Sequence, residues 1–349
     1  MKKSFVIASI LGLFFVLAIL GPLSTPQALA KSIELSLGTH PPPKASPVRG
    51  ALLPWTKEVE KQTNGQVKIK IYPSQTLVKM RDAYDGVIRG IADISWGSFS
   101  LTPGRFPLIS VMELPFLSPN TFVGAHTLHD LFKKFPEIRA ELKDVHMLDL
   151  WVTLPYEIHT VKKPVRTMAD LKGMKLATQP GARAALEALG AIPVTMGAPK
   201  IYQAVEKGIA DGAVLAWGAF NAYKLYEVTK YHANAHLGGL PYFLVINKNS
   251  WAKLSKENQT VITKLTQKMW PDIVCGAVSK EMEIGIKKTK AKKNEIVDFS
   301  PEELKDWIAT GKPEWNKWVK KMESKGLPGQ AVLDEAVKLV EKYSKIYMK

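Results

Sequence analysis

The chain has 349 residues, a formal net charge of +16 and one cysteine, Cys275. One cysteine excludes an intramolecular disulfide, and this length is typical of two domains whose cores are stable without such links. A basic excess can indicate a nucleic acid or an anionic membrane as partner. The lysines are instead scattered along expected helix faces, for example between residues 287 and 293, so we predict a solvated basic surface and no nucleic-acid partner.

The first thirty residues have the pattern of a cleaved signal peptide. Two lysines precede an apolar run from Phe5 to Leu20, and Ala28-Leu29-Ala30 supplies a small-residue cleavage site. The run is short for a membrane span of about 20 residues, which makes an uncleaved anchor the weaker alternative. We predict that residues 1–30 are removed and that the mature protein is periplasmic.

Strands and helices alternate from residue 33 onward. Apolar and polar residues alternate over 33–37 and 67–71, as expected of half-buried strands. Residues 47–63 and 83–90 have helical spacing, and residues 91–96 have the composition of a strand.

The middle of the chain continues this alternation. Two nearly continuous apolar runs, 146–154 and 242–247, are expected to be strands covered on both faces. Repeated alternation of strands and helices predicts an α/β fold with mainly parallel sheets. In such folds, ligands usually bind where loops leave the carboxyl ends of the strands.

The last third of the chain is expected to be mainly helical. Residues 255–293 have helical spacing over an unusual length, enough to link two lobes. Ser300 with Glu303, like Thr167 with Asp170 earlier, fits a capping box at a helix start. The tail after Ser300 carries three tryptophans that we expect to pack it onto the body, at positions 307, 315 and 318.

The familiar cofactor and catalytic motifs do not occur in the sequence. There is no G-x-G-x-x-G and no G-x-x-x-x-G-K-[ST], and residues 97–100 lack the second glycine of a nucleophile elbow. The pairs His126/His129 and His232/His236 could each share a face, but neither has a third ligand within local spacing. We therefore expect no cofactor, no metal and no enzymatic activity.

Two stretches are candidates for a ligand site. Residues 172–181, "KGMKLATQPG", predict a strand, a tight loop and a helix start, whose free N–H groups could hold an anion near Thr178. Residues 211–232 place Trp217 among small residues at a strand-to-helix junction. Trp217 could belong to the core or could stack on a ligand, and the sequence leaves both open.

Several stretches, in order, resemble the extracytoplasmic solute-binding proteins of tripartite ATP-independent periplasmic (TRAP) transporters, the dicarboxylate-binding-protein-like family. The similarity extends over nearly all of the mature chain. The stretches that carry it are "PWTKEVEKQTNGQVKIKIYPSQTL", "GIADISW", "PGRFPLISVMELPF", "RTMADLKGMKLATQPG", "LEALGAIPVTM", "IYQAVEKGIADG", "KLYEVTKYH" and "INKNSWAKLS".

The resemblance implies a bilobal periplasmic-binding-protein-like fold, with two α/β domains, a hinge and a long helix spanning both. We expect residues 31–155 plus 242–282 in lobe I, and residues 156–241 plus 283–349 in lobe II. A small organic acid would bind in the cleft and be delivered to the membrane subunits of a TRAP transporter. The protein would be a monomer or a dimer.

The resemblance also implies where the site departs from the family pattern. Most members clamp the substrate carboxylate with an arginine on the strand after "DLKG", and here Ala177 stands at that position. Tyr156 stands at a second position that is often basic, and Leu215 replaces a common polar residue. The implied site is less cationic than a dicarboxylate site, which favours an aromatic or apolar monocarboxylate. The other residues expected to contact the ligand are Trp217, Thr178, Tyr242, His40 and Trp96.

Three alternatives stay open at this stage. Arg183, Arg81 or Arg105 could replace the missing arginine and bind a C4-dicarboxylate or a keto acid. An exported enzyme could use Tyr156, Glu157 and His159 as acid and base, although successive strand residues point to opposite faces. A ligand sensor that has lost transport would present the same cleft to a different receptor.

Overall fold

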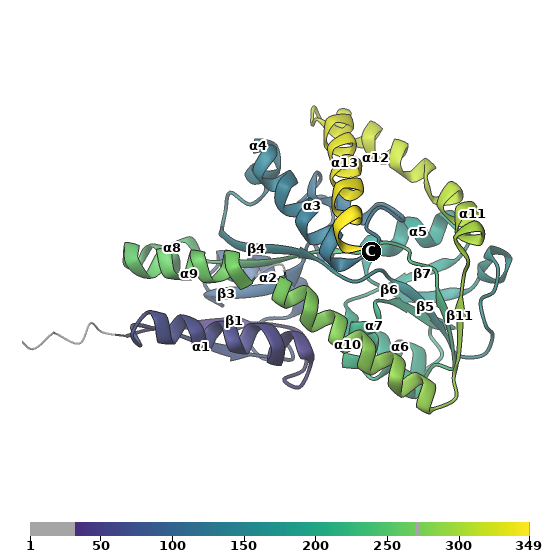
Figure 1. The fold of residues 1–349 in the computed structure, drawn as a ribbon, viewed down its shortest axis with the longest axis horizontal. Coiled ribbons are helices and arrows are strands. Elements are labelled where there is room, and N and C mark those ends of the chain that lie inside the picture. Colours follow the sequence, from purple (N-terminus) through teal and green to yellow (C-terminus); the bar gives the residue numbers. More distant parts are fainter. Residues whose placement is uncertain (1–31, 270–271, 349) are drawn as a thin grey trace, which may run out of the picture. The chain divides into compact units, whose positions relative to one another are not determined.

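Two β-sheets organise the chain (Figure 1). The computed structural model describes residues 32–269 and 272–348, so the predicted signal peptide lies outside the described residues. The first sheet has the order β2-β1-β3-β10-β4 and the second the order β11-β9-β5-β8-β6-β7. This mixed α/β architecture with two sheets confirms the predicted fold class.

The strands of the first sheet are β1 (Ile33–Gly38), β2 (Val67–Tyr72), β3 (Ile94–Ser98), β4 (His146–Val152) and β10 (Pro241–Ile246). Apolar alternation or an apolar run predicts four of them, and composition predicts β3. Strands β1, β2 and β3 are parallel, whereas β10 runs antiparallel to both β3 and β4.

The strands of the second sheet are β5 (Glu157–Thr160), β6 (Lys175–Thr178), β7 (Ile192–Thr195), β8 (Gly212–Leu215), β9 (Tyr231–Asn234) and β11 (Glu295–Asp298). Strand β5 runs antiparallel to β8 and β9, while the other pairs are parallel. The prediction of mainly parallel sheets is therefore incomplete. The chain passes from β4 in the first sheet to β5 in the second sheet, and later from β9 in the second sheet to β10 in the first. Neither connection contains a helix.

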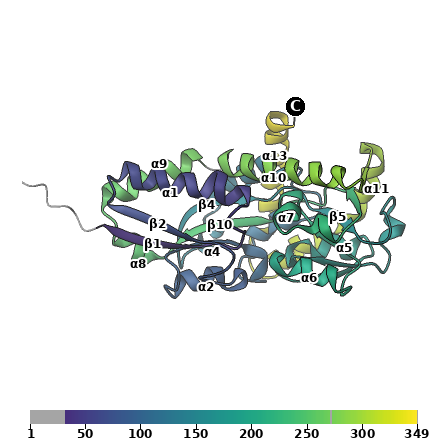
Figure 2. The same cartoon turned by 90° about the horizontal axis from the view of Figure 1, so that it is seen from below.

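The helices pack against the sheets and against each other (Figures 1 and 2). They are α1 (Leu53–Gln62), α2 (Ala83–Ile88), α3 (Thr121–Lys134), α4 (Pro136–Glu141), α5 (Arg183–Ala188), α6 (Ile201–Glu206), α7 (Trp217–Ala222), α8 (Lys248–Ala252), α9 (Lys256–Met269), α10 (Asp272–Ala291), α11 (Pro301–Gly311), α12 (Pro313–Glu323) and α13 (Gly329–Tyr347). A five-residue π-helical segment, Val48–Leu52, precedes α1, and short 3₁₀ turns cover 80–82, 99–101, 109–113, 168–171, 180–182, 198–200 and 225–227.

The predicted long helix is seen as α9 and α10, on either side of residues 270–271, which lie outside the described residues. Helix α9 contacts α1 and β4, whereas α10 packs along α7 and also contacts α3. This region therefore touches β4 of the first sheet and α7, which follows β8 of the second sheet, as a helix spanning two lobes would. No helix in the described part of the chain combines the length and the apolar character needed to cross a bilayer.

The C-terminal helices pack onto the body through the expected tryptophans. Trp307 and Trp318 are buried, the indole N–H of Trp318 donates to Ser110 Oγ at 2.8 Å, and that of Trp315 donates to the Pro115 carbonyl at 3.0 Å. Helix α13 lies against α3, which the sequence predicts in lobe I. The boundaries predicted for the two lobes stay a prediction, and this contact favours assigning α12 and α13 to the first lobe.

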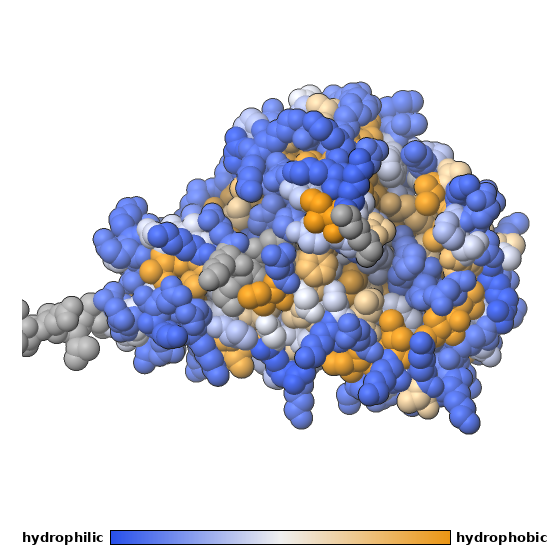
Figure 3. Space-filling model, in the orientation of Figure 1, coloured by the Kyte–Doolittle hydropathy of each residue, from blue (hydrophilic) through white to orange (hydrophobic). Residues whose placement is uncertain are grey.

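The surface shown in Figure 3 is mainly hydrophilic, with small and separate hydrophobic areas. The exposed large apolar side chains come from different parts of the chain, apart from Ile346 and Met348 near the C-terminus; they are Leu53, Ile91, Ile192, Ile209, Ile273, Ile308, Ile346 and Met348. Scattered apolar residues of this kind are normal on a protein surface. We therefore look for an apolar binding surface inside the protein.

Candidate functional site

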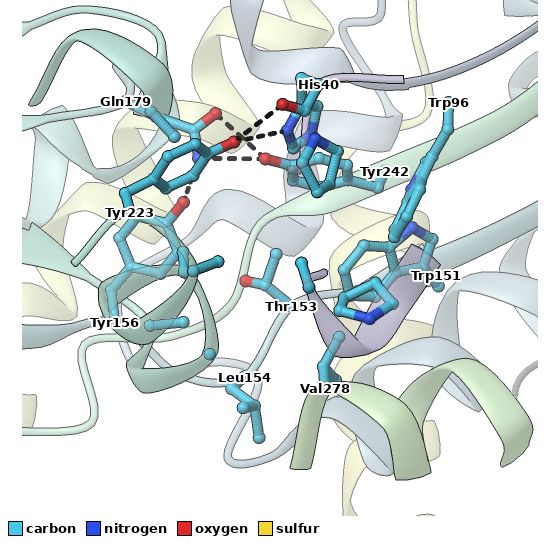
Figure 4. A pocket seen from close by; sticks show the side chains of 18 residues that line it. His40, Trp96, Trp151, Thr153, Leu154, Tyr156, Gln179, Tyr223, Tyr242 and Val278 are labelled. Carbon is cyan, nitrogen blue, oxygen red and sulfur yellow. Dashed lines mark hydrogen bonds between the residues drawn. The ribbon is translucent and has the colours of Figure 1, made fainter. Parts of the chain in front are cut away.

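A cavity of about 60 Å³ lies where the two sheets meet (Figure 4). Eighteen residues from both sheets line it, and their positions follow the rule for α/β proteins, because most come from strand ends or the loops directly after them. They are His40, Pro41, Ala45, Pro47, Trp96, Trp151, Thr153, Leu154, Tyr156, Gln179, Ala198, Ala216, Gly218, Ala219, Ala222, Tyr223, Tyr242 and Val278.

The first sheet supplies an aromatic wall. Tyr242 of β10 is paired with Trp151 of β4, and their ring centroids are 5.0 Å apart. Trp96 of β3 lies 5.4 Å from Trp151 by the same measure. Offset and tilted rings at these distances attract one another beyond the area that they bury. The wall is therefore a set of tilted rings against which an apolar ring can pack.

The opposite wall is made of small side chains. Ala216 follows β8, and Gly218, Ala219 and Ala222 lie on one side of α7. Gly218 lies where α7 meets α10, since an added Cβ would be 3.2 Å from the Val278 carbonyl oxygen. Because these side chains are short, they leave an open space opposite the aromatic wall.

Polar groups gather at one end of the cavity, as the dashed lines of Figure 4 show. Gln179, directly after β6, donates through Nε2 to the hydroxyl of Tyr156 and, at 3.1 Å, to that of Tyr242. The Tyr242 hydroxyl also lies 3.2 Å from Gln179 Oε1, to which it can donate. Gln179 thus connects the second sheet to the first across the cavity.

His40 completes this polar end from the loop after β1. Its Nδ1 lies 2.9 Å from the Tyr223 hydroxyl, and that hydroxyl lies 3.4 Å from the His40 carbonyl oxygen. The imidazole also packs near two rings of the aromatic wall, with centroids 6.0 Å from Trp96 and 5.7 Å from Tyr242. His40 Nε2 is buried without a hydrogen-bond partner among the described residues.

The cavity is electrically neutral at neutral pH. None of the eighteen lining residues, all within the described ranges, is a lysine, arginine, aspartate or glutamate. Burial lowers the pKa of His40 to about 3, and burial raises the pKa values of Tyr156, Tyr223 and Tyr242 far above neutrality. The wall therefore offers neutral donors and acceptors and no fixed charge.

Four of the nine predicted ligand residues line the cavity: His40, Trp96, Tyr156 and Tyr242. Their contact with a ligand stays a prediction. The other five lie elsewhere, and the structure gives a physical reason for each.

Trp217 and Thr178 satisfy their polar groups away from the cavity. The Trp217 indole N–H donates to Asn234 Oδ1 at 2.8 Å, and its ring packs on His159 and Phe220. Thr178 Oγ1 donates to the Val214 carbonyl at 2.9 Å. Both side chains belong to the interior of the second lobe.

Ala177 and Leu215 are fully buried in the core and do not reach the cavity wall. Arg183 points outward, where it pairs with Glu187 at 2.8 Å and its side chain is 61% exposed. The helix start after residue 178 holds no open anion site either. An added Cβ on Gly181 would lie within 3.0 Å of Leu240, Glu113 and Ser100, so these side chains cover the turn.

The other two candidate arginines also lie away from the cavity. Arg105 pairs with Asp85 and with Asp144. Arg81 lines a surface pocket beside α2 and is not among the cavity residues.

The residues considered for an enzyme do not converge. Glu157 accepts from the backbone N–H and the side chain of His236, at 2.8 and 2.7 Å. His159 Nδ1 lies 3.0 Å from His232 Nδ1, on the far side of the strand from Tyr156. In the described part of the chain, no group of three or more histidine, cysteine or acidic residues is placed to hold a metal.

Sequence reasoning missed four large or polar wall residues, Trp151, Thr153, Gln179 and Tyr223. Gln179 could have been predicted as a wall residue, because residues two apart in an extended segment face the same side. Ala177, two residues earlier, stands at the position of the family's arginine. Trp151 and Thr153 lie in the run 146–154, whose continuous apolar character conceals which face each residue takes. Tyr223 had no signal of its own.

An uncharged cavity with an aromatic wall and hydrogen-bonding groups at one end is a site for a small ligand. The model of a family described as bacterial extracellular solute-binding protein, family 7, matches residues 38–322. The chain belongs to this family, which confirms the resemblance to TRAP solute-binding proteins noted from the sequence.

Two relatives illustrate the range of the family. The chain is 28% identical over 213 residues to the 2,3-diketo-L-gulonate-binding periplasmic protein of Escherichia coli, which covers 60% of this chain and 64% of that relative, slightly under two thirds. It is 26% identical over 293 residues to the C4-dicarboxylate-binding periplasmic protein of Rhodobacter capsulatus, covering 82% of this chain and 86% of that relative.

Solved structures of TRAP solute-binding proteins share the fold. One from Rhodoferax ferrireducens, in complex with copurified benzoate, has a TM-score of 0.84 and 29% identity, covering 90% of this chain and 99% of that one. One from a marine metagenome, specific for aromatic acid ligands and crystallised with 3-hydroxybenzoate, has a TM-score of 0.82 and 30% identity, with coverage of 90% and 99%.

Proposed function

We propose that this protein is the periplasmic solute-binding subunit of a TRAP transporter and that it captures a small aromatic monocarboxylate in the cavity between its lobes. The observation that carries the proposal is the composition of the wall. It has an aromatic cluster of Trp96, Trp151 and Tyr242, neutral hydrogen-bonding side chains that include His40, Tyr156, Gln179 and Tyr223, and no charged group among the described lining residues. The pattern of residues 1–30 supports export, and the family supports delivery to membrane subunits.

The aromatic wall favours a ring as the ligand's apolar part. Burying an aromatic surface of about 100–150 Å² contributes roughly 3 kcal/mol at 25 cal/mol per Å². An apolar cavity of about 150 Å³ holds benzene in an engineered protein. Because the cavity here is about 60 Å³, we expect the wall formed by α7 and α10 to move away from Trp96 and Trp151 when a ring enters.

The polar end favours a single carboxylate. Gln179, Tyr156, Tyr223 and His40 all have neutral groups that can turn toward a carboxylate oxygen. A C4-dicarboxylate would bury a second charge among Leu154, Val278 and the alanines of α7, where no cation is available in the described wall. The proposal therefore ranks aromatic acids such as those bound by the two solved relatives above dicarboxylates.

Thermal shift and calorimetry on the protein lacking residues 1–30 test this proposal. The panel contains benzoate, 3-hydroxybenzoate and phenylacetate, with succinate and malate as dicarboxylates and benzyl alcohol as an uncharged match for the ring. A ligand at 100 times its Kd stabilises the folded protein by about 2.7 kcal/mol. We expect this shift with the aromatic acids. A shift with succinate but none with any aromatic acid would overturn the ligand class.

A sensor without transport function remains a second candidate for the biological role, since the same cavity would serve it. Genes for the two TRAP membrane subunits beside the gene of this protein favour transport. Reconstitution of those subunits in vesicles, with uptake of labelled benzoate that depends on this protein, decides between the two roles.

A further inference from the structure

His40 is the one residue lining the described cavity whose ordinary pKa, about 6.5, lies near neutrality. The three tyrosines ionise only far above neutrality because they are buried, and the remaining side chains do not titrate. A carboxylate that enters the cavity as an anion therefore meets no positive charge. Burying an isolated carboxylate costs many kcal/mol, and a buried group normally avoids this cost by a change in protonation.

The imidazole of His40 is placed to supply the missing charge. The residue is only 8% exposed, and its Nε2 is buried with no hydrogen-bond partner within residues 32–269 and 272–348. This nitrogen belongs to a side chain that lines the cavity, at the same end as Gln179 and Tyr242 (Figure 4). A ligand oxygen that reaches this end can therefore accept a hydrogen bond from a protonated Nε2.

The other side of the ring already accommodates the protonated form. When both nitrogens carry hydrogen, Nδ1 donates to the Tyr223 oxygen, 2.9 Å away. The Tyr223 hydroxyl then directs its own hydrogen to the His40 carbonyl oxygen, 3.4 Å away. Only Nε2–H is left without an acceptor, and a ligand carboxylate provides one.

The groups that face His40 from neighbouring elements do not neutralise its charge. Trp96 of β3, Tyr242 of β10 and Tyr223 after α7 are all neutral. The buried acid on α10, Glu281, already accepts from the Ser46 N–H and from the side-chain amide of Asn221. Glu113, whose charge acts on the nearby Tyr156, is protonated at neutral pH because burial raises its pKa to about 8.

We propose that His40 takes up one proton when a monocarboxylate binds, so that the ligand is held as a buried imidazolium–carboxylate pair. This inference rests on the proposed function and adds the source of the counter-charge. It replaces the arginine clamp of the family with a charge that exists only in the complex. Binding energy then depends on pH, because each molecule of ligand brings one proton with it.

The sign of the pH dependence follows from the protonation state of His40 before a ligand binds. Burial keeps the pKa of His40 near 3 before binding, so the ring is neutral from pH 5 upward. The bound carboxylate raises this pKa. Between the pKa of the ligand and that of His40 in the complex, the Kd should rise about tenfold for each unit of increase in pH.

Isothermal titration calorimetry with benzoate tests the inference. We would titrate the mature protein at pH 5.5, 6.5 and 7.5, each in two buffers that differ in ionisation enthalpy, which gives the number of protons taken up. We expect close to one proton for each benzoate. His40→Gln keeps a donor but cannot be protonated, so its Kd should vary less than twofold over this range, with no proton uptake.

His146→Gln is the matched control, because His146 stacks on Trp251 at the far end of β4 and does not line the cavity. It should keep the proton uptake and the pH slope of the unaltered protein. If His40→Gln does not fold, ¹⁵N NMR of labelled histidine in the unaltered protein replaces it. The His40 nitrogens should then move to imidazolium shifts when benzoate is added at pH 6.5.

The outcomes separate this inference from the proposed function. Benzoate binding without proton uptake overturns the role of His40 and leaves the aromatic ligand class standing. Proton uptake that persists in His40→Gln also overturns it, because the proton then resides on the ligand or on another residue. If no aromatic acid binds at any pH, the proposed function fails and the inference fails with it.

Discussion

Replacing Gln179 by leucine should destabilise the protein, because this side chain satisfies two buried phenols at once. Tyr156 and Tyr242 are 1% and 3% exposed, and both bond to the Gln179 amide. A buried polar group left without a partner costs about 1–3 kcal/mol. Tyr156 then loses its hydrogen-bond partner, whereas Tyr242 keeps one to Ser98. We therefore expect a loss of roughly 1–3 kcal/mol in the free energy of unfolding, read from urea denaturation followed by tryptophan fluorescence without ligand.

The combination of Gln179→Leu with Tyr156→Phe and Tyr242→Phe distinguishes lost hydrogen bonds from lost packing. Removing all the partners of a polar cluster can be nearly neutral, so the triple variant should be more stable than Gln179→Leu alone. Gln203→Leu, on the exposed face of α6, is the surface control and should change stability by less than about 0.5 kcal/mol. If the losses in the free energy of unfolding simply add across the three substitutions, the hydrogen-bond explanation is wrong, because neighbours that share hydrogen bonds are not additive.

Three further predictions concern the cavity and the second lobe. Ala222→Phe places a ring in a cavity of about 60 Å³ and should abolish benzoate binding in calorimetry, with a loss of about 1–3 kcal/mol in stability from overpacking. An unaltered Kd would remove α7 from the site. Trp217→Ala should lower the stability by about 3–5 kcal/mol and change the benzoate Kd less than threefold, because its ring is buried in the core. A small change in stability with a large increase in Kd would instead place Trp217 in the binding site. Burial lowers the pKa of His232 to about 3, so the unfolded chain binds more protons below pH 6.5 and stability is lost as the pH falls. Relative to His232→Asn, the unaltered protein should lose about 1.4 kcal/mol per pH unit between pH 6 and 4 in urea midpoints, and parallel profiles would contradict this.

The strands of the first sheet could be predicted because each has a strong local pattern. Alternation over 33–37 and 67–71, and apolar runs at 146–154 and 242–247, mark four of the five strands at nearly their observed bounds. The capping box at Ser300 likewise predicted the start of α11, and both of its reciprocal hydrogen bonds are present. A local sequence pattern does not show the direction of a strand relative to its neighbours. The antiparallel pairing of β5 and β10 could therefore not be predicted from such a pattern.

The site was only partly predictable, for a geometric reason. A six-residue helix such as α7 makes fewer than two turns, so its sequence does not fix which side faces a cavity. Trp217 was expected at the ligand, yet Gly218, Ala219 and Ala222 take that side and turn its ring to the core. The resemblance directed attention to the position of Ala177, and the polar group on the cavity wall is Gln179, two residues further along the chain.

The place of β10 in the first sheet has a consequence for how the chain acquires its structure. Strand β10 (residues 241–246) lies between β3 and β4 and pairs with both, so this part of the first sheet cannot form until about two hundred residues after the start of β1 have been made. Pairing over such sequence distances is slow, and until it occurs the edge of β3 away from β1 and the edge of β4 that meets β10 are unpaired. A fragment that ends after β4 would present both edges to other chains, so the first sheet needs residues 241–246 to be complete.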